Sequence, residues 1–160
     1  MIKPEARIEE IITRLRERGH RITPQRMAVI KTLVTNDGHM SIEQVYDHVQ
    51  GNFPMTSLAT IYKTTSLLME MGELIELSIP NSGSRYDCRN PVPHPHLICN
   101  HCGSIIDVDV GSLSDLPLKV SAETGYLVVS HRLDFFGICP QCQDIPSGEQ
   151  SHGGGITDTK

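Results

Sequence analysis

The segment HPHLICNHC, residues 94–102, decides how the second half of this 160-residue chain is organised. It ends in a Cys-x-x-Cys pair, Cys99 and Cys102, and a second such pair, Cys139 and Cys142, follows further along the chain. Each pair places two thiolates on one tight turn, and two such turns complete the tetrahedral sulfur shell that zinc favours. The alternatives are a thioredoxin-like redox pair or incidental cysteines, but a redox motif does not usually come twice. We therefore expect a structural zinc ion with no open coordination position.

The same segment also carries donors of a second kind. His94 and His96 share one side of an extended chain, because alternate residues face the same way. Asp87, Asp107 and His39 offer further carboxylate and imidazole groups, a mixture that Fe²⁺, Mn²⁺ or Zn²⁺ accepts without thiolates. Each also has an ordinary interpretation, His39 as a loop histidine and the two aspartates as surface charges. The spacing alone leaves open whether these five side chains converge.

The N-terminal half has the periodicity of helices. Apolar residues between Ile8 and Leu15 recur on one helical face, and Gly19 is expected to end that helix. Thr23 and Pro24 form a typical helix start for a second helix. Ser41 with Gln44 predicts a capping box at the start of a third.

A fourth helix is expected from Ser57 to Met71, with Leu58, Ile61 and Leu68 facing inward. After it, the alternating stretches 74–79 and 84–88 predict two strands joined by a turn at 81–83. Helices followed by a two-stranded hairpin are typical of a winged helix, a variant of the helix-turn-helix.

The chain as a whole is predicted to be α+β, with a winged helix over residues 1–88 and a hinge at 89–92. A small α/β zinc-binding domain follows at 93–145, with strands near 97–99, 104–108 and 127–137 and a helix over 113–123. The fifth cysteine, Cys88, is expected to be an ordinary strand residue. The composition of residues 146–160, rich in Gly and Ser, predicts a disordered tail.

Composition and charge narrow the class of protein. Hydrophobic residues make up 38% of the chain and charged residues 21%, as in an ordinary globular protein. No apolar run is long enough for a membrane helix or a secretory signal, so we expect a cytoplasmic protein. The net charge is −5, which argues mildly against nucleic acid, yet basic residues gather near the N-terminus. They form either a basic face for nucleic acid or a solvated helix face: Arg14, Arg16, Arg18, Arg21, Arg26 and Lys31.

Several of these segments, taken together, resemble the ferric uptake regulator (Fur) family. The resemblance covers residues 5–143 and rests on His39 and on the following segments: 21–26 (RITPQR), 57–63 (SLATIYK), 85–87 (RYD), 94–99 (HPHLIC) and Cys102-Gly103. It implies a dimeric, metal-dependent transcription factor that binds a palindromic operator. The N-terminal domain would be a DNA-binding winged helix and the C-terminal domain an α/β dimerisation domain. A regulatory Fe²⁺ or Mn²⁺ would bind at the hinge, in addition to one structural zinc per subunit.

One carboxylate indicates which branch of the family the chain is similar to. Iron-uptake regulators usually carry Glu at the position of Asp107, whereas the peroxide-sensing, PerR-type branch carries Asp there and a second Asp at the position of Asp87. The resemblance therefore implies peroxide sensing, with oxidation of a ligand histidine as the signal. The regulatory ligands that it implies are His39, Asp87, His94, His96 and Asp107. The implied oxidation-sensitive residues are His39 and His94.

The sequence departs from the family at a further metal site that many relatives have. Two of the ligand positions of that site fall on Pro93 and Pro95, which have no donor side chain. We therefore expect this site to be absent and His131, which matches its remaining histidine, to have a structural role.

DNA contacts are expected from two places. On the fourth helix, which matches the recognition helix of a winged helix, they are expected from Ser57, Thr60, Tyr62, Lys63 and Thr64. Lys63 replaces the usual family arginine, which makes a phosphate contact as plausible as base reading. Contacts to the DNA backbone are expected from Arg18, Arg21 and Arg26.

Three other functions compete with a peroxide-sensing repressor. A Fur-like iron or manganese sensor without peroxide chemistry would share the fold and the ligands. A metal-dependent hydrolase would use His94, His96 and an acid at an open zinc, but a preceding winged helix argues against it. A zinc-stabilised interaction module would have no role at DNA.

Overall fold

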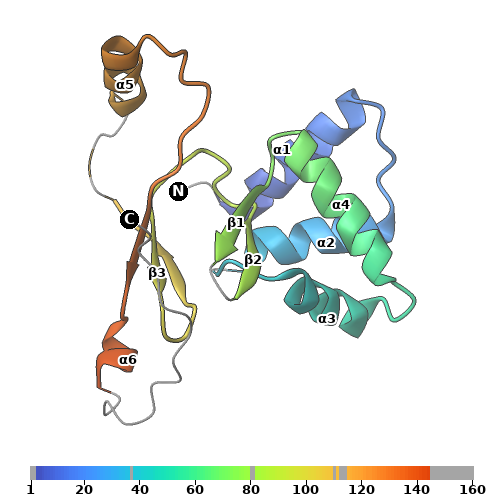
Figure 1. Cartoon of the computed structure of the whole chain (residues 1–160). Coiled ribbons are helices and arrows are strands. Elements are labelled where there is room, and N and C mark those ends of the chain that lie inside the picture. Colours follow the sequence, from blue (N-terminus) through green and yellow to red (C-terminus); the bar gives the residue numbers. More distant parts are fainter. Residues whose placement is uncertain (1–2, 37, 80–81, 110, 112–114, 145–160) are drawn as a thin grey trace. The chain divides into compact units, whose positions relative to one another are not determined.

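The computed structural model describes residues 3–36, 38–79, 82–109, 111 and 115–144. It divides into two compact units (Figure 1). The N-terminal unit comprises Met1–Ile79 with Gly83–Pro93, and the C-terminal unit comprises Pro80–Ser82 with His94–Lys160. The tail predicted to be disordered, 146–160, lies outside the described residues. Within the described part of the chain, no helix has the length and apolar character needed to cross a bilayer.

The N-terminal unit is a winged helix made of four helices and a hairpin. Its helices and strands are α1 (Pro4–Glu17), α2 (Pro24–Thr35), α3 (Ile42–Asn52), α4 (Leu58–Glu70), β1 (Ile75–Ile79) and β2 (Gly83–Asp87). The helix α2 contacts α1, α3 and α4, and Figure 1 shows it in the middle of the helical group. The two strands pair antiparallel, with Ile75 opposite Asp87.

The predicted helix starts are confirmed. The Thr23 side chain accepts a hydrogen bond from the backbone N–H of Arg26 at 3.2 Å. Ser41 and Gln44 form the complete capping box, in which each side chain bonds the other residue's backbone N–H. Such caps satisfy N–H groups that have no partner inside the helix, so they fix where a helix begins.

A single backbone bridge ties the segment before α3 to the hairpin. The backbone N–H of Tyr86 donates to the carbonyl of Met40 at 2.9 Å, which makes an antiparallel bridge. This pairing spans more than forty positions of sequence and has no local sequence signal. It fixes the residue before α3 beside the end of β2.

The buried face of α4 differs from the prediction. Ile61 and Leu68 are fully buried as expected, but Leu58 is 39% exposed and so lies outside the core. Thr64 and Thr65 are buried instead, so the prediction that Thr64 faces DNA is wrong. Both threonine hydroxyls donate to carbonyls one turn earlier, which lets them enter the core without an unpaired polar group.

The C-terminal unit is a small sheet with two helices. Its elements are β3 (His96–Cys99), β4 (Ile105–Asp107), α5 (Leu116–Thr124), β5 (Asp134–Gly137) and α6 (Pro140–Gln143). The strand order is β4-β3-β5, with β3 antiparallel to β4 and parallel to β5. Only the last part of the stretch 127–137 forms a strand, so the predicted strand was too long.

The C-terminal unit buries little apolar surface in the single chain. Its helix α5 has no buried residue and lies apart from the sheet in Figure 1. Large apolar side chains at least two-fifths exposed are Ile106, Leu116, Leu118, Val120, Tyr126, Leu127, Val129, Phe135, Phe136 and Ile138. Exposed apolar surface on this scale is typical of a face that another protein chain covers.

Candidate metal centres

The four cysteines of the two Cys-x-x-Cys pairs come together in the C-terminal unit. Their sulfur atoms all lie within 4.8 Å of one another. The Sγ atoms of Cys102 and Cys139 are 3.7 Å apart, close to the separation of about 3.8 Å that four Zn–S bonds of about 2.3 Å impose on a tetrahedron. The cluster therefore fits a structural zinc ion, as predicted.

Both cysteine pairs are held in tight turns. In the first, the backbone N–H of Gly103 donates to the Cys99 carbonyl, and Gly103 has a φ of 71°, which favours glycine. In the second, the N–H of Cys142 donates to the Cys139 carbonyl at the start of α6. Such turns fix both thiolates of a pair on one side of the chain.

The surroundings of the first pair favour thiolates. Burial alone would raise the pKa of Cys99, but N–H donors from Cys102, Cys139 and His101 outweigh it and lower the pKa to about 6. A hydrogen bond with the Ser104 hydroxyl lowers the pKa of Cys102. Zinc binds the thiolate form, so these donors prepare the pair for the metal.

Three of the predicted regulatory ligands lie close together in the C-terminal unit. Asp107 Oδ1 is 3.2 Å from His94 Nε2 and 3.9 Å from His96 Nε2. The two imidazole rings have centroids 4.3 Å apart. His96 is 2% exposed, whereas the Asp107 side chain is 56% exposed. The group therefore has a buried imidazole on one side and a carboxylate open to solvent on the other.

The other two predicted ligands lie together in the N-terminal unit. His39 Nε2 is 3.9 Å from Asp87 Oδ2, and both side chains are 7% exposed. The bridge between Met40 and Tyr86 explains this, because it aligns the residues next to it. Asp87 Oδ1 accepts hydrogen bonds from the N–H groups of Arg89 and Asn90, at 2.8 and 3.2 Å. These bonds hold the carboxylate with its other oxygen toward His39.

An acidic neighbour of His96 was missed by the sequence analysis. Asp134 Oδ1 lies 3.4 Å from His96 Nδ1, and Arg132 Nε lies 2.5 Å from Asp134 Oδ2. Asp134 follows no ligand motif and reaches His96 only because β3 and β5 pair side by side. The sequence carried no signal for that pairing.

His131 and Cys88 have different outcomes. His131 is exposed in the single chain, so the expected structural role is wrong as far as packing within this chain is concerned. Cys88 is fully buried directly after β2, where burial raises the pKa of its thiol to about 12. It therefore behaves as a small apolar side chain.

The residues predicted to contact DNA are placed as follows. Ser57 caps α4, and Tyr62 and Lys63 are exposed on that helix, with Tyr62 47% exposed. Thr60 is half-buried, and its hydroxyl lies 3.0 Å from that of Ser57. Arg18 and Arg21 are exposed, while Arg26 is half-buried and its guanidinium donates to the Arg21 carbonyl.

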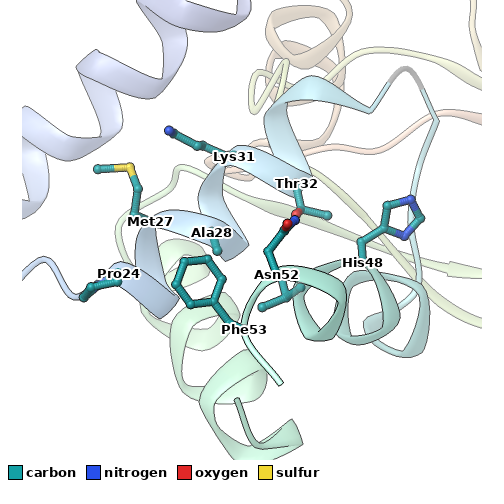
Figure 2. Close-up of a pocket in the computed structure, with 9 residues that line it drawn as sticks. Pro24, Met27, Ala28, Lys31, Thr32, His48, Asn52 and Phe53 are labelled. Carbon is teal, nitrogen blue, oxygen red and sulfur yellow. The ribbon is translucent and has the colours of Figure 1, made fainter. Parts of the chain in front are cut away.

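A cavity of about 210 Å³ lies between α2 and α3 (Figure 2). Figure 2 shows Asn52 and Phe53 at the end of α3 facing Ala28 and Thr32 of α2. Its lining contains one histidine, His48, and no cysteine or carboxylate. This cavity is therefore not a metal site.

Comparison with known proteins identifies the family. The ferric uptake regulator family model matches residues 17–136. The peroxide-responsive repressor PerR of Staphylococcus aureus (strain USA300) is 36% identical over 140 residues, which cover 88% of this chain and 94% of that protein.

Solved structures agree with this. The Helicobacter pylori ferric uptake regulator Fur, described as having three functional metal binding sites, has a TM-score of 0.75 at 25% identity. That similarity covers 91% of this chain and 97% of the other. The Campylobacter jejuni peroxide stress regulator has a TM-score of 0.66 at 26% identity, covering 84% of this chain and 98% of the other.

The two kinds of site suit this family. The four cysteines fit a structural zinc, and the imidazole and carboxylate donors fit a regulatory divalent metal. The chain belongs to the ferric uptake regulator family, and it is therefore a metal-responsive transcriptional regulator and not an enzyme.

Proposed function

We propose that this regulator is a peroxide-sensing repressor of genes for oxidative stress and metal homeostasis. The observation that carries the proposal is the aspartate at position 107, 3.2 Å from His94, in a chain that is 36% identical to a peroxide-responsive repressor. The proposed ligands of the regulatory Fe²⁺ or Mn²⁺ are His39, Asp87, His94, His96 and Asp107. Two come from the N-terminal unit and three from the C-terminal unit, so a shared metal would tie the units together, with residues 89–92 as the hinge.

Bound Fe²⁺ would supply the one-electron chemistry that activates hydrogen peroxide. The protein's part is to present an imidazole carbon of His39 or His94 to the oxidant. In the net reaction the O–O bond breaks, one oxygen atom is added to the imidazole carbon and the other leaves as water. The imidazole is thereby oxidised and the peroxide reduced. An oxidised imidazole is a poor ligand, so the tie between the units is lost and repression ends.

The first test is the mass of the histidine peptides after peroxide. In protein loaded with Fe²⁺, we expect peptides containing His39 or His94 to gain the mass of one oxygen atom, and promoter DNA to be released in a gel-shift assay. Peptides carrying the exposed His48 and His131 should stay unmodified, since neither residue is a proposed ligand. Protein loaded with Mn²⁺ is the control and should keep both its mass and its DNA.

A second candidate is a Fur-like iron or manganese sensor, favoured by the TM-score of 0.75 to the H. pylori regulator. It predicts the same metal-dependent DNA binding but no oxidised histidine. Release of DNA by peroxide from an unmodified protein would contradict the proposed mechanism.

We further propose that the protein acts as a homodimer on a palindromic operator. The exposed apolar side chains of the C-terminal unit suit a second copy of the chain. Two winged helices would then face two half-sites. The proposed contacts are Ser57, Thr60, Tyr62 and Lys63 on α4, with Arg18, Arg21 and Arg26 nearby in sequence.

The contribution of Lys63 can be measured through salt. If it contacts a phosphate, Lys63→Ala should weaken binding to operator and unrelated DNA alike and flatten the plot of log affinity against log salt by about 0.9 per subunit contact. Lys119→Ala removes an equally exposed lysine from α5 and should change neither quantity. Loss of discrimination between sequences without a change in slope would assign Lys63 to base reading instead.

A further inference from the structure

A row of three ionisable side chains crosses the sheet of the C-terminal unit. Asp107 of β4 is the register partner of His96 of β3, and Asp134 of β5 is the register partner of the same histidine on its other side. Residues directly opposite each other in neighbouring strands point to the same face of a sheet. The strand order β4-β3-β5 therefore places one buried imidazole between two carboxylates.

Each nitrogen of His96 faces a different carboxylate. Nε2 lies 3.9 Å from Asp107 Oδ1, and Nδ1 lies 3.4 Å from Asp134 Oδ1. The two carboxylates differ in environment, since the Asp107 side chain is 56% exposed and that of Asp134 is 11% exposed. The exposed carboxylate belongs to the proposed metal site, and the buried one lies behind the histidine.

Asp134 is itself held in place. Its other oxygen, Oδ2, is 2.5 Å from Arg132 Nε, an ion pair that fixes the carboxylate and keeps it charged. The backbone N–H of His96 donates to the Leu133 carbonyl at 3.2 Å, so the two strands are joined next to this pair. A separation of 3.4 Å slightly exceeds the usual range of about 2.7–3.2 Å for N–H···O bonds, so a small rotation of the ring brings the pair into range.

We propose that Asp134 is a positioning residue for the regulatory metal. Its carboxylate accepts the Nδ1 proton of His96, which selects the tautomer whose Nε2 lone pair faces Asp107 and the metal. Arg132 supports Asp134 from behind. In metal sites such a carboxylate behind a ligand histidine orients the ring and raises its basicity. The proposal about the metal rests on the proposed function, whereas the selection of the tautomer does not.

The test compares Asp134→Asn with Asp109→Asn in the full-length protein holding its structural zinc. Asp109 is an exposed aspartate of the same unit whose Oδ1 accepts the Gly111 N–H, a role that an asparagine oxygen can keep. Both variants lose one negative charge, so they separate the position of the carboxylate from net charge. Zinc content and circular dichroism check that each variant is folded.

Two measurements are made on each variant. Nitrogen NMR of the protein without regulatory metal should show His96 with a protonated Nδ1 in the parent and in Asp109→Asn, and a mixture of tautomers in Asp134→Asn. Titration with Mn²⁺ should show affinity weakened by roughly 10- to 100-fold in Asp134→Asn and nearly unchanged in Asp109→Asn. Asp134→Glu, which restores a carboxylate, should recover part of the affinity, and it replaces Asp134→Asn if the latter fails to fold.

The outcomes separate the two proposals. An unchanged tautomer in Asp134→Asn, or an unchanged Mn²⁺ affinity, overturns the positioning role. A parent protein that shows the expected tautomer but binds Mn²⁺ no better than His96→Ala refutes the proposed metal site while leaving the His96–Asp134 pair in place.

Discussion

Replacing Cys142 with serine is expected to unfold the C-terminal unit of this regulator. The described part of the unit has few buried side chains, and they are Ile98 together with the proposed metal ligands His96, Cys99 and Cys142. Because so little apolar surface is removed from water, the sheet depends on the zinc rather than on a hydrophobic core. Structural zinc contributes about 10–16 kcal/mol in zinc-finger peptides, far more than this core can supply.

The measurement is zinc content together with thermal unfolding followed by circular dichroism. Cys142→Ser should lose most of its zinc and the signal of the C-terminal unit, while the helices of the N-terminal unit still melt cooperatively. Cys88→Ala is the matched control, since Cys88 is buried in the N-terminal unit and is not a ligand. It should retain a full complement of zinc. A Cys142→Ser protein with full zinc content would contradict the four-cysteine site.

Replacing Arg7 with methionine is expected to destabilise the N-terminal unit by about 3–5 kcal/mol. Arg7 is 2% exposed and Glu73 is fully buried, and their closest N–O distance is 2.8 Å. Arg7 also donates to the carbonyls of Cys88 and Glu73, both at 3.1 Å. Removing the guanidinium leaves a buried carboxylate with only Arg14 beside it, at 2.6 Å.

Denaturant unfolding of the N-terminal unit measures this loss. The double variant Arg7→Met with Glu73→Met should recover much of the stability, because replacing a buried ion pair by apolar side chains is far less costly than breaking it. Arg14→Met should have a smaller effect, since its side chain is 48% exposed. If Arg7→Met alone were neutral, the pair would not contribute to stability as described.

The local features of the fold could be predicted from sequence. The caps at Thr23 and Ser41 act on neighbouring N–H groups, and each Cys-x-x-Cys pair lies within one turn, so short-range patterns are sufficient. Features that depend on distant pairing could not be predicted. Nothing near Met40 indicates that it bonds Tyr86, and nothing near Asp134 indicates that it lies beside His96.

The errors on α4 have a physical cause as well. Thr64 was expected outside because threonine is polar, yet a helix supplies a carbonyl one turn earlier for its hydroxyl. Leu58 was expected inside, yet at the first position of the helix it lies 39% exposed. Periodicity gives the direction of a side chain but not how far the core extends along the helix.

The bridge between Met40 and Tyr86 has a thermodynamic consequence under the proposed function. His39 and Asp87 each adjoin a residue of this bridge, so whatever holds these two ligands together also holds the hairpin against the segment before α3. If DNA favours the same arrangement of the hairpin, binding of DNA must raise the affinity for metal by the factor by which metal raises the affinity for DNA. A repressor on its operator would then retain its regulatory ion at metal concentrations at which the free protein has lost it.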